Sequence, residues 1–392
     1  MKTVEEHCAD VLALLRVGPR VEVPLAEALG LVLAEDLRSE VALPPFDNSA
    51  MDGYAVRRKD VAEPPTVLPV ADDIPAGRTN VAALKAGTAH RIMTGAPLPP
   101  GADAIVPVER TDGGTDVVRI DVTPDVHAHI RWTGEDVARD AVALPAGAIL
   151  DAAQLGLAAA IGRAVLPVHR RPRVVVLSTG TELVEPGLPL KPGQIYESNG
   201  IMLAAAALAA GAQARRVRFV TDDVAEFRAA IEAATVDADL LLTSGGVSAG
   251  AYEVVKDAFT GAGVTFAKVA MQPGMPQGFG YAGGIPVITL PGNPVSAFVS
   301  FEAFVRPLIR KALGHRALTR PVVRAVLADS ARSPAGKRQF QRGRYADGMV
   351  HLVGGPPSHL LASLATSDCL VVIPEDVTEL EAGAEVDVWK LR

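Results

Sequence analysis

The 392-residue chain is 49% hydrophobic and 21% charged, a composition typical of folded globular proteins and not of disordered ones. At about 150 residues per domain, the length predicts two to three domains, each large enough to bury an apolar core without disulfides or structural metals. The formal net charge is −7 and no long basic run occurs, which argues against a nucleic-acid-binding surface.

Residues 1–45 are predicted to be mainly helical. Apolar residues recur at helical spacing from Val4 to Leu15, and a second short helix is predicted within Pro24–Leu37. Between residues 46 and 139 the pattern changes to short β-like segments separated by Pro/Gly turns, which predicts a small β domain. The strands of this domain are expected at 54–56, 91–93, 104–106 and 117–120.

A further helix is predicted over 152–161, on the other side of the β segment. We therefore expect residues 1–45 and 140–170 to pack together as a linking domain of helical and mixed structure. The β domain of residues 46–139 would then be inserted into this linking domain.

Residues 171–318 alternate between near-continuous apolar runs and helical segments. This pattern is typical of an α/β domain with a mostly parallel sheet that is covered on both faces. Strands are expected at 173–177, 214–220, 239–243, 264–269 and 286–290, and a long last helix at 294–313. After it, residues 319–392 return to short strands with Pro/Gly turns and predict a small C-terminal β-barrel-like domain. The fold class is thus multidomain α/β plus β.

The compartment is predicted from the cysteines and the N-terminus. Only Cys8 and Cys369 occur, at opposite ends of the sequence, as expected in a reducing compartment. The acidic start lacks the basic-then-apolar order of a signal peptide, and the apolar stretch 148–168 is interrupted by polar residues. We expect a soluble, cytoplasmic protein.

Ligands of parallel α/β sheets bind outside the carboxyl ends of the strands. Here the segments that follow the predicted strands are small, hydroxyl-rich or Gly-rich: 178–182, 221–223, 243–250, 271–276 and 291–296. The segment Thr243–Gly250 leads into a helix and is a candidate phosphate cradle, because glycines let backbone N–H groups approach an anion. The structural alternative is a set of tight strand-to-helix turns.

Three carboxylates near this edge, Glu182, Asp222 and Glu253, would repel a phosphorylated ligand. A divalent cation such as Mg²⁺ would remove that conflict, since it is typically held by one or two carboxylates and by phosphate oxygens. The alternative is that these acids complement helix dipoles. No Walker A loop, G-x-G-x-x-G after a strand, or H-E-x-x-H occurs.

One segment matches G-x-S-x-G, the nucleophile elbow of hydrolases, at Gly246–Gly250. Three residues separate its first glycine from the apolar strand, and the downstream histidines lie outside the α/β segment. A hydrolase is therefore disfavoured.

The predicted β domain also carries polar strings. Residues 46–56 contain Asp47, Asn48, Ser49 and Asp52, more than a single Asp-Gly turn requires.

Taken together, these strings resemble one family, the MoeA-type molybdopterin molybdenumtransferases, to which the gephyrin E domain is related. The matching strings are PPFDNSAMDGYAV (44–56), RIMTGAPLPPGADAIVPVE (91–109), IRWTGEDV (130–137), STGTEL (178–183), QIYESN (194–199), TSGGVSAG (243–250), LPGNPVSAF (290–298) and FQRG (340–343). They cover nearly the whole chain in family order.

The resemblance implies a four-domain homodimer that inserts molybdate into adenylated molybdopterin and releases AMP with the help of Mg²⁺. It implies an active site between the α/β domain of one subunit and β domains of the other. The molybdopterin adenylyltransferase and apo-molybdoenzymes are the further partners it suggests.

Carried over by motif position, the implied functional residues are Asp52, Thr94, Asp136, Glu182, Asp222, Glu253, Lys268, Pro291, Pro294 and Ser358. Ser244, Gly245, Gly246 and Ser248 would hold the phosphate of the pterin. Glu182, Glu253 and Asp52 are the candidate metal ligands. Asp52, Thr94, Asp136 and Lys268 would act at the scissile phosphoanhydride, with Arg342 as a further candidate cation.

The chain departs from the family pattern after Lys268. Gln272 and Met275 stand where the family commonly has two lysines, which lowers the expected oxyanion affinity. Glu253 replaces a shorter Asp of the same charge. Three alternatives stay open: a divergent molybdopterin-binding or scaffold protein, an adenylyltransferase, which would need only the α/β segment, and tungstate as the oxyanion.

Overall fold

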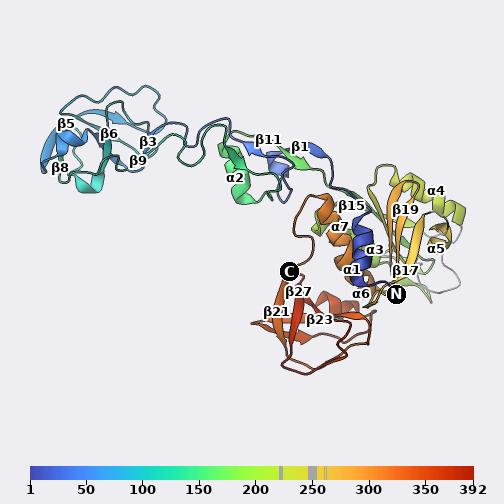
Figure 1. Ribbon diagram of the computed structural model, residues 1–392. Coiled ribbons are helices and arrows are strands. Elements are labelled where there is room, and N and C mark those ends of the chain that lie inside the picture. Colours follow the sequence, from blue (N-terminus) through green and yellow to red (C-terminus); the bar gives the residue numbers. More distant parts are fainter. Residues whose placement is uncertain (220–223, 246–253, 260, 262) are drawn as a thin grey trace. The chain divides into compact units, whose positions relative to one another are not determined.

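The computed structural model describes the chain except residues 220–223, 246–253, 260 and 262, and divides it into two compact units (Figure 1). The larger unit comprises Met1–Glu22, Gly30–Ala34 and Pro167–Arg392, and the smaller unit comprises Val23–Leu29 and Glu35–Leu166. Of the four points at which the chain passes between them, two lie within the paired strands β1 (Arg20–Pro24) and β11 (Val165–His169), and two lie at residues 29–30 and 34–35. In the part of the chain that is described, no helix is long and apolar enough to cross a bilayer.

The larger unit is built on a six-stranded sheet in the order β15-β12-β16-β20-β19-β17. The strands are β12 (Arg173–Thr179), β15 (Gln213–Phe219), β16 (Leu240–Ser244), β17 (Val264–Lys268), β19 (Pro276–Ala282) and β20 (Ile285–Leu290). The helices are α3 (Asn199–Ala209), α4 (Val224–Thr235), α5 (Val254–Phe259), α6 (Pro294–Ser300) and α7 (Arg306–Ala312). The pairs β12–β15, β12–β16 and β16–β20 are parallel, which confirms the predicted α/β domain.

The apolar runs are continuous because both faces of the sheet are covered. Leu241 packs with Ile231 of α4 and Phe259 of α5 on one face. Val176 and Leu242 are the next residues along β12 and β16 and point to the other face, where they are fully buried and where α3 contacts β12 and β15.

Strand β19 was not predicted. It is antiparallel to both neighbours, so β17 runs in the same direction as β20 and ends at the same edge of the sheet. Its sequence contains Gly278 and Gly280, which are unfavourable in strands. Gly278 is required there, because a Cβ atom would lie 2.1 Å from Thr289 Oγ1 on β20.

The predicted long helix after the last strand of the sheet is confirmed. α6 and α7 are continuous through a π-helical segment η4 (Phe301–Val305), and Gly314 follows in the left-handed conformation (φ +81°). The N-terminal helix α1 (Val4–Leu12) is capped by Thr3 and Glu6 and packs on η4 and α7; Figure 1 shows it (blue) beside α7 (orange). The expectation that all of residues 1–45 pack with 140–170 is therefore wrong for α1.

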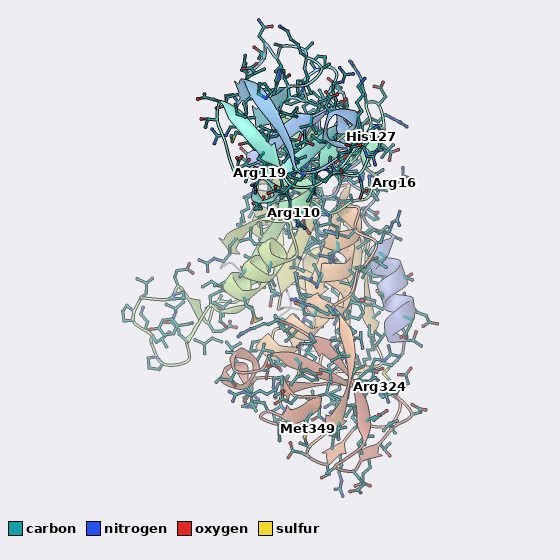
Figure 2. All side chains as sticks on the ribbon, turned by 90° about the vertical axis from the view of Figure 1, so that its left-hand side faces the viewer. Arg16, Arg110, Arg119, His127, Arg324 and Met349 are labelled. Atoms are coloured by element: carbon teal, nitrogen blue, oxygen red, sulfur yellow. The ribbon has the colours of Figure 1, made fainter. Side chains whose placement is uncertain are left out.

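The C-terminal strands close into a five-stranded barrel, as predicted. Its strands are β21 (Val322–Leu327), β23 (Arg338–Ala346), β24 (Met349–Leu352), β25 (Cys369–Ile373) and β27 (Glu385–Lys390). The order β23-β24-β21-β27-β25 closes through the β23–β25 pairing. Smaller elements are α8 (Leu361–Ala365), β22 (Ala331–Arg332) and β26 (Glu379–Leu380), which pairs with β22. Arg324 of β21 forms ion pairs with Glu385 and Asp387 on the barrel surface (Figure 2).

The smaller unit contains the predicted β domain. Its main sheet has the order β7-β4-β6-β5-β8, with β4 (Gly53–Val56), β5 (Thr66–Ile74), β6 (Ala89–Ile92), β7 (Ala104–Pro107) and β8 (Val117–Ile120). The other elements are β2 (Leu37–Arg38), β3 (Asn48–Ser49), β9 (Ile130–Arg131), β10 (Val142–Leu144), α2 (Ala152–Ala160) and the 3-10 turns η1 (Leu25–Glu27), η2 (Arg58–Val61) and η3 (Val108–Arg110). The predicted helix within Pro24–Leu37 is wrong: it is only η1, and Gly30 turns the backbone into the left-handed region (φ +75°).

Candidate active site

The carboxyl edge of the larger sheet borders a cavity of about 310 Å³, which we call the first cavity. It lies where β12 and β16 end and where α3 and α6 begin. Its polar lining comprises Ser178, Thr179, Glu182, Glu197, Ser198, Asn199, Ser244, Gly245, Gly292 and His359. The prediction that small and hydroxyl-bearing residues gather at this edge is thus confirmed for the described residues of 178–182, 243–250 and 291–296, whereas 271–276 lines a different cavity.

Asn199, at the start of α3, ties three of these segments together. Its Nδ2 donates hydrogen bonds to Ser244 Oγ (2.8 Å) and to the Gly292 carbonyl (2.7 Å). Its Oδ1 is buried and accepts no hydrogen bond from the described residues. A ligand N–H or O–H in the cavity would satisfy this oxygen, so the site fits a ligand with hydrogen-bond donors.

The described part of the predicted phosphate cradle, Ser244 and Gly245, lines the first cavity. Gly245 is in the left-handed conformation (φ +94°), which glycine adopts without strain. Ser244 Oγ lies 3.4 Å from the Pro291 carbonyl, and Pro294 begins α6 at the same cavity. The predicted residues Asp222, Gly246, Ser248 and Glu253 lie outside the described residues.

Two carboxylates line this cavity and differ in environment. Glu197 is 1% exposed; it accepts hydrogen bonds from Ser178 Oγ (3.0 Å) and the Gly200 amide (2.6 Å), and Arg216 Nη1 lies 2.9 Å away. Glu182 is exposed at the cavity, between the end of β12 and the short strand β13 (Leu183–Val184), which pairs with β14 (Ile195–Tyr196). Glu197 is therefore held by protein donors, whereas Glu182 is open to solvent and to the cavity.

A second cavity of about 450 Å³ is lined by Ser358, the residue before His359. It is lined by Met271, Gln272, Pro273, Gly274, Met275, Pro276, Ser296, Lys337, Pro356, Pro357 and Ser358. Among the described residues of this lining, Lys337 is the single cation and there is no carboxylate, so the cavity suits an anion. Lys268 is exposed at the end of β17 and lines neither described cavity, and its catalytic role stays a prediction.

Ser358, which lines the second cavity, is held by two hydrogen bonds. Its hydroxyl accepts a hydrogen bond from Asn293 Nδ2 (2.9 Å), and its carbonyl accepts one from the Val295 amide (3.1 Å) at the start of α6. His359, the next residue, brings an imidazole from the barrel domain into the first cavity.

Arg342 does not supply a free charge to the site. It is 3% exposed, and its guanidinium donates to the carbonyls of Val353, Gly355 and Pro357. Burial lowers the pKa of this guanidinium. The expectation that Arg342 offsets developing charge is corrected: it holds the segment that carries Ser358.

The smaller unit contains the predicted Asp52, Thr94 and Asp136. Asp52 Oδ1 accepts hydrogen bonds from the Thr94 amide (2.6 Å) and hydroxyl (2.8 Å), and these bonds lower the pKa of Asp52. Asp47 binds Thr133 in the same way, at 2.8 and 2.7 Å. Asp136 is exposed, and its amide donates to the Leu43 carbonyl. The structure joins Asp52 to Thr94, while the catalytic roles of all three stay predictions.

The described residues contain no group of three or more His, Cys, Asp or Glu that could hold a metal ion. Of the predicted ligands, Glu182 lies in the larger unit and Asp52 in the smaller one. The Mg²⁺ expectation therefore stays a prediction.

Sequence reasoning missed Asn199, Lys337 and His359 as site residues. Asn199 had a local signal, because it ends the QIYESN string at the start of a predicted helix. Lys337 and His359 had none: each is a single residue in a turn of the barrel domain, and tertiary structure alone brings it to a cavity.

Three family models match consecutive parts of the chain. They are the MoeA N-terminal region (domain I and II) over residues 2–162, the probable molybdopterin binding domain over 175–311, and the MoeA C-terminal region (domain IV) over 324–391.

Full-length relatives and a solved structure are also similar. Molybdopterin molybdenumtransferase 2 of Mycobacterium tuberculosis is 55% identical over 404 residues, which covers 100% of both chains. Molybdopterin molybdenumtransferase 1 of the same species is 40% identical over 420 residues, covering 99% of this chain and 98% of the relative. The crystal structure of the molybdopterin biosynthesis moeA protein from Pyrococcus horikoshii OT3 matches with a TM-score of 0.84 at 29% identity and covers 100% of both chains.

Proposed function

The chain belongs to the MoeA family of molybdopterin molybdenumtransferases and is a transferase of molybdenum cofactor biosynthesis; from this premise we propose that it inserts molybdate into adenylated molybdopterin and releases AMP. The observation that carries the proposal is the pair of cavities lined by the consecutive residues Ser358 and His359. The first cavity is lined by hydroxyls, glycines and Asn199, whose amide oxygen has no partner among the described residues. The described lining of the second cavity has one cation, Lys337, and no carboxylate.

The first cavity would bind the pterin and its phosphate. Ser244 and Gly245, with Gly246 and Ser248, would cradle the phosphate, because hydroxyls and glycine N–H groups suit its oxygens. Asn199 Oδ1 would accept a hydrogen bond from an N–H of the pterin.

The second cavity would hold molybdate before transfer. Lys337 would supply the positive charge, and Gln272 and Ser358 would donate hydrogen bonds to its oxygens. This assignment offers a reason why the chain tolerates Gln272 and Met275 in place of the two family lysines. Tungstate, nearly the same size, is a second oxyanion that this cavity would accept.

Mg²⁺ would assist by neutralising phosphate charge. Glu182 is suited to hold it together with phosphate oxygens, since one carboxylate and several oxygen ligands are typical for Mg²⁺. Glu253 and Asp52 are further candidate ligands. Asp52, Asp136 and Lys268 would act at the phosphoanhydride.

The further proposals are a homodimer, a cytoplasmic location, and exchange of substrate and product with the adenylyltransferase and apo-molybdoenzymes. They rest on the resemblance and, for the location, on two cysteines that form no disulfide. A scaffold role is not favoured, because the full-length relatives are named as transferases.

The test is AMP release from adenylated molybdopterin with Mg²⁺, with and without molybdate, followed by activation of an apo-molybdoenzyme. We expect AMP release that depends on molybdate, and an active molybdoenzyme. Tight binding of the pterin without AMP release under either condition would refute the transferase reaction and support a carrier or scaffold.

A further inference from the structure

The segment that carries Lys268 and Gln272 lies between two distant parts of the chain. On one side, the Lys2 amide donates to the Lys268 carbonyl (3.0 Å) and the Ala270 amide donates to the Lys2 carbonyl (2.8 Å). On the other side, the Arg338 amide of β23 donates to the Ala270 carbonyl (2.9 Å). The N-terminus, the end of β17 and the barrel thus form one small ladder.

This ladder continues on the barrel side into the short strand β18 (Met271–Gln272). β18 pairs in parallel with β23, with Met271 opposite Arg338 and Gln272 opposite Gln339. Lys337 immediately precedes this pairing. The ladder therefore brings Gln272 and Lys337, from different domains, to the same cavity.

The side chain of Arg338 also links the N-terminal helix to the barrel. The Arg338 guanidinium forms an ion pair with Glu5 of α1 and hydrogen bonds of 3.1 to 3.3 Å with Glu375 of the barrel. Arg338 is less exposed (23%) than Glu5 (61%) or Glu375 (44%). The pairing with Arg338 lowers the pKa of Glu5 against the effect of burial.

We propose that the N-terminal segment Met1–Glu5 is a positioning element of the oxyanion cavity, with Glu5 and Arg338 as its positioning residues. It acts by fixing the backbone of residues 268–272 against the barrel, so that Gln272 stays at the cavity that Lys337 also lines. The inference rests on the proposed function, because it assigns the N-terminal segment a role in molybdate binding.

The physical reason is that molybdate binding requires residues 268–272 to be held in one conformation. The segment 268–272 continues from β17, and the Val269 amide donates to the Met275 carbonyl (2.8 Å). Its further backbone partners among the described residues are Lys2 and the barrel strand β23. When the N-terminal segment around Lys2 detaches, the Lys268 carbonyl and the Ala270 amide form hydrogen bonds with water instead of with Lys2. Residues 268–272 then sample more conformations. Molybdate binding must then restore the order, which weakens its apparent affinity.

The main test compares Glu5→Gln with Glu385→Gln. Both substitutions remove one carboxylate from an ion pair with an arginine, but the Glu385–Arg324 pair lies on β27 and β21, whose sheet neighbours are each other, β24 and β25. For Glu5→Gln we expect faster amide hydrogen exchange at residues 268–272 and a KM for molybdate raised about two- to fivefold, the range of an exposed ion pair. The kcat and the KM for adenylated molybdopterin stay unchanged, and Glu5→Asp restores most of the affinity.

A second pair of variants tests the backbone bond itself. In protein carrying a short N-terminal tag, so that residue 2 stays an internal peptide, Lys2→Pro removes the amide that donates to Lys268. Lys2→Ala keeps that amide and removes only the ammonium contacts with Asp10 and Phe279. We expect Lys2→Pro, and not Lys2→Ala, to reproduce the effects of Glu5→Gln.

The outcomes separate the two proposals. Unchanged exchange at 268–272 in Glu5→Gln and Lys2→Pro overturns the positioning role, and so does faster exchange with an unchanged KM for molybdate. A similar rise of KM in Glu385→Gln also overturns it, because the effect would then be non-local. If the wild-type protein releases no AMP, the proposed function fails, and the exchange measurement alone decides whether the N-terminal segment fixes the loop.

Discussion

Replacing Lys337 by Ala should weaken molybdate binding more than any other single change in the second cavity. The cavity contains one cation and no carboxylate, so the substitution leaves the bound dianion without a charged partner. A hydrogen bond to a charged group contributes about 1.5–3 kcal/mol. Because Lys337 is half-buried, solvent screening places the effect near the lower value, or about a tenfold rise in KM.

The same reasoning predicts a rescue. Gln272 lines the same cavity, and Gln272→Lys would place a second ammonium there. In the wild-type background it should tighten molybdate binding, and in the Lys337→Ala background it should restore most of the lost affinity. The two effects should be non-additive, because either lysine can serve the one anion.

The assay is AMP release as a function of molybdate concentration at low and high salt, with direct titration of molybdate as a second measurement. Arg332→Ala, which removes a barrel arginine that is 88% exposed, is the control and should have no effect. The KM of the wild type should rise with salt, while that of Lys337→Ala should depend on salt less. An unchanged KM in Lys337→Ala, or additive effects in the double variant, would refute the assignment of this cavity to the oxyanion.

Three further predictions follow from the site and the core. Asp52→Ala should abolish AMP release and Asp47→Ala should not, with similar losses of thermal stability, because each loses the same two hydrogen bonds to a threonine; equal activities would contradict the role of Asp52. Gly245→Ala should lower the free energy of unfolding by about 1–2 kcal/mol and should also reduce AMP release. Gly187→Ala, at a similar φ (+95°) but away from the cavity, should lower only the free energy of unfolding, measured by denaturant titration. Burial lowers the pKa of His7 to about 4, so the unfolded chain binds a proton below pH 6.5 that the folded protein excludes; stability should fall as the pH drops from 6.5 to 4, by about 1.4 kcal/mol per unit, and His7→Phe should remove this slope in denaturation midpoints.

The elements that were predicted correctly share a strong local signal. The strands β12, β16 and β20 are rich in apolar residues because both faces of the sheet are buried, and the one proline among them, Pro286, stands near the start of β20. β19 has no such signal: Gly278 and Gly280 accommodate close neighbours, and those neighbours come from other strands. The prediction of a short helix at Pro24–Leu37 was wrong for a different reason. The spacing of its apolar residues is helical, but the structure forms only η1 and Gly30 turns the backbone away.

The site shows the same division. Ser244, Gly245 and Glu182 were predicted because each follows a strand that the sequence identifies, so the edge of the sheet could be inferred. Lys337 was missed because its place at the cavity depends on the pairing of β18 with β23, a contact between residues 271–272 and 338–339 that no local pattern encodes. Arg342 was misassigned because the sequence does not reveal that the carbonyls of residues 353–357 occupy its donors.

The segment from residue 353 to 361 joins the two cavities. Pro356, Pro357 and Ser358 line the second cavity, while His359 and Leu361 line the first. Arg342 donates to the carbonyls of Gly355 and Pro357, and Asn293 and Val295 donate to Ser358. Because Ser358 and His359 are consecutive, we expect a shift of the backbone at one cavity to displace the neighbouring residue at the other. Filling of the first cavity by the pterin would in this way alter the walls of the oxyanion cavity, which couples the two substrates through a single loop.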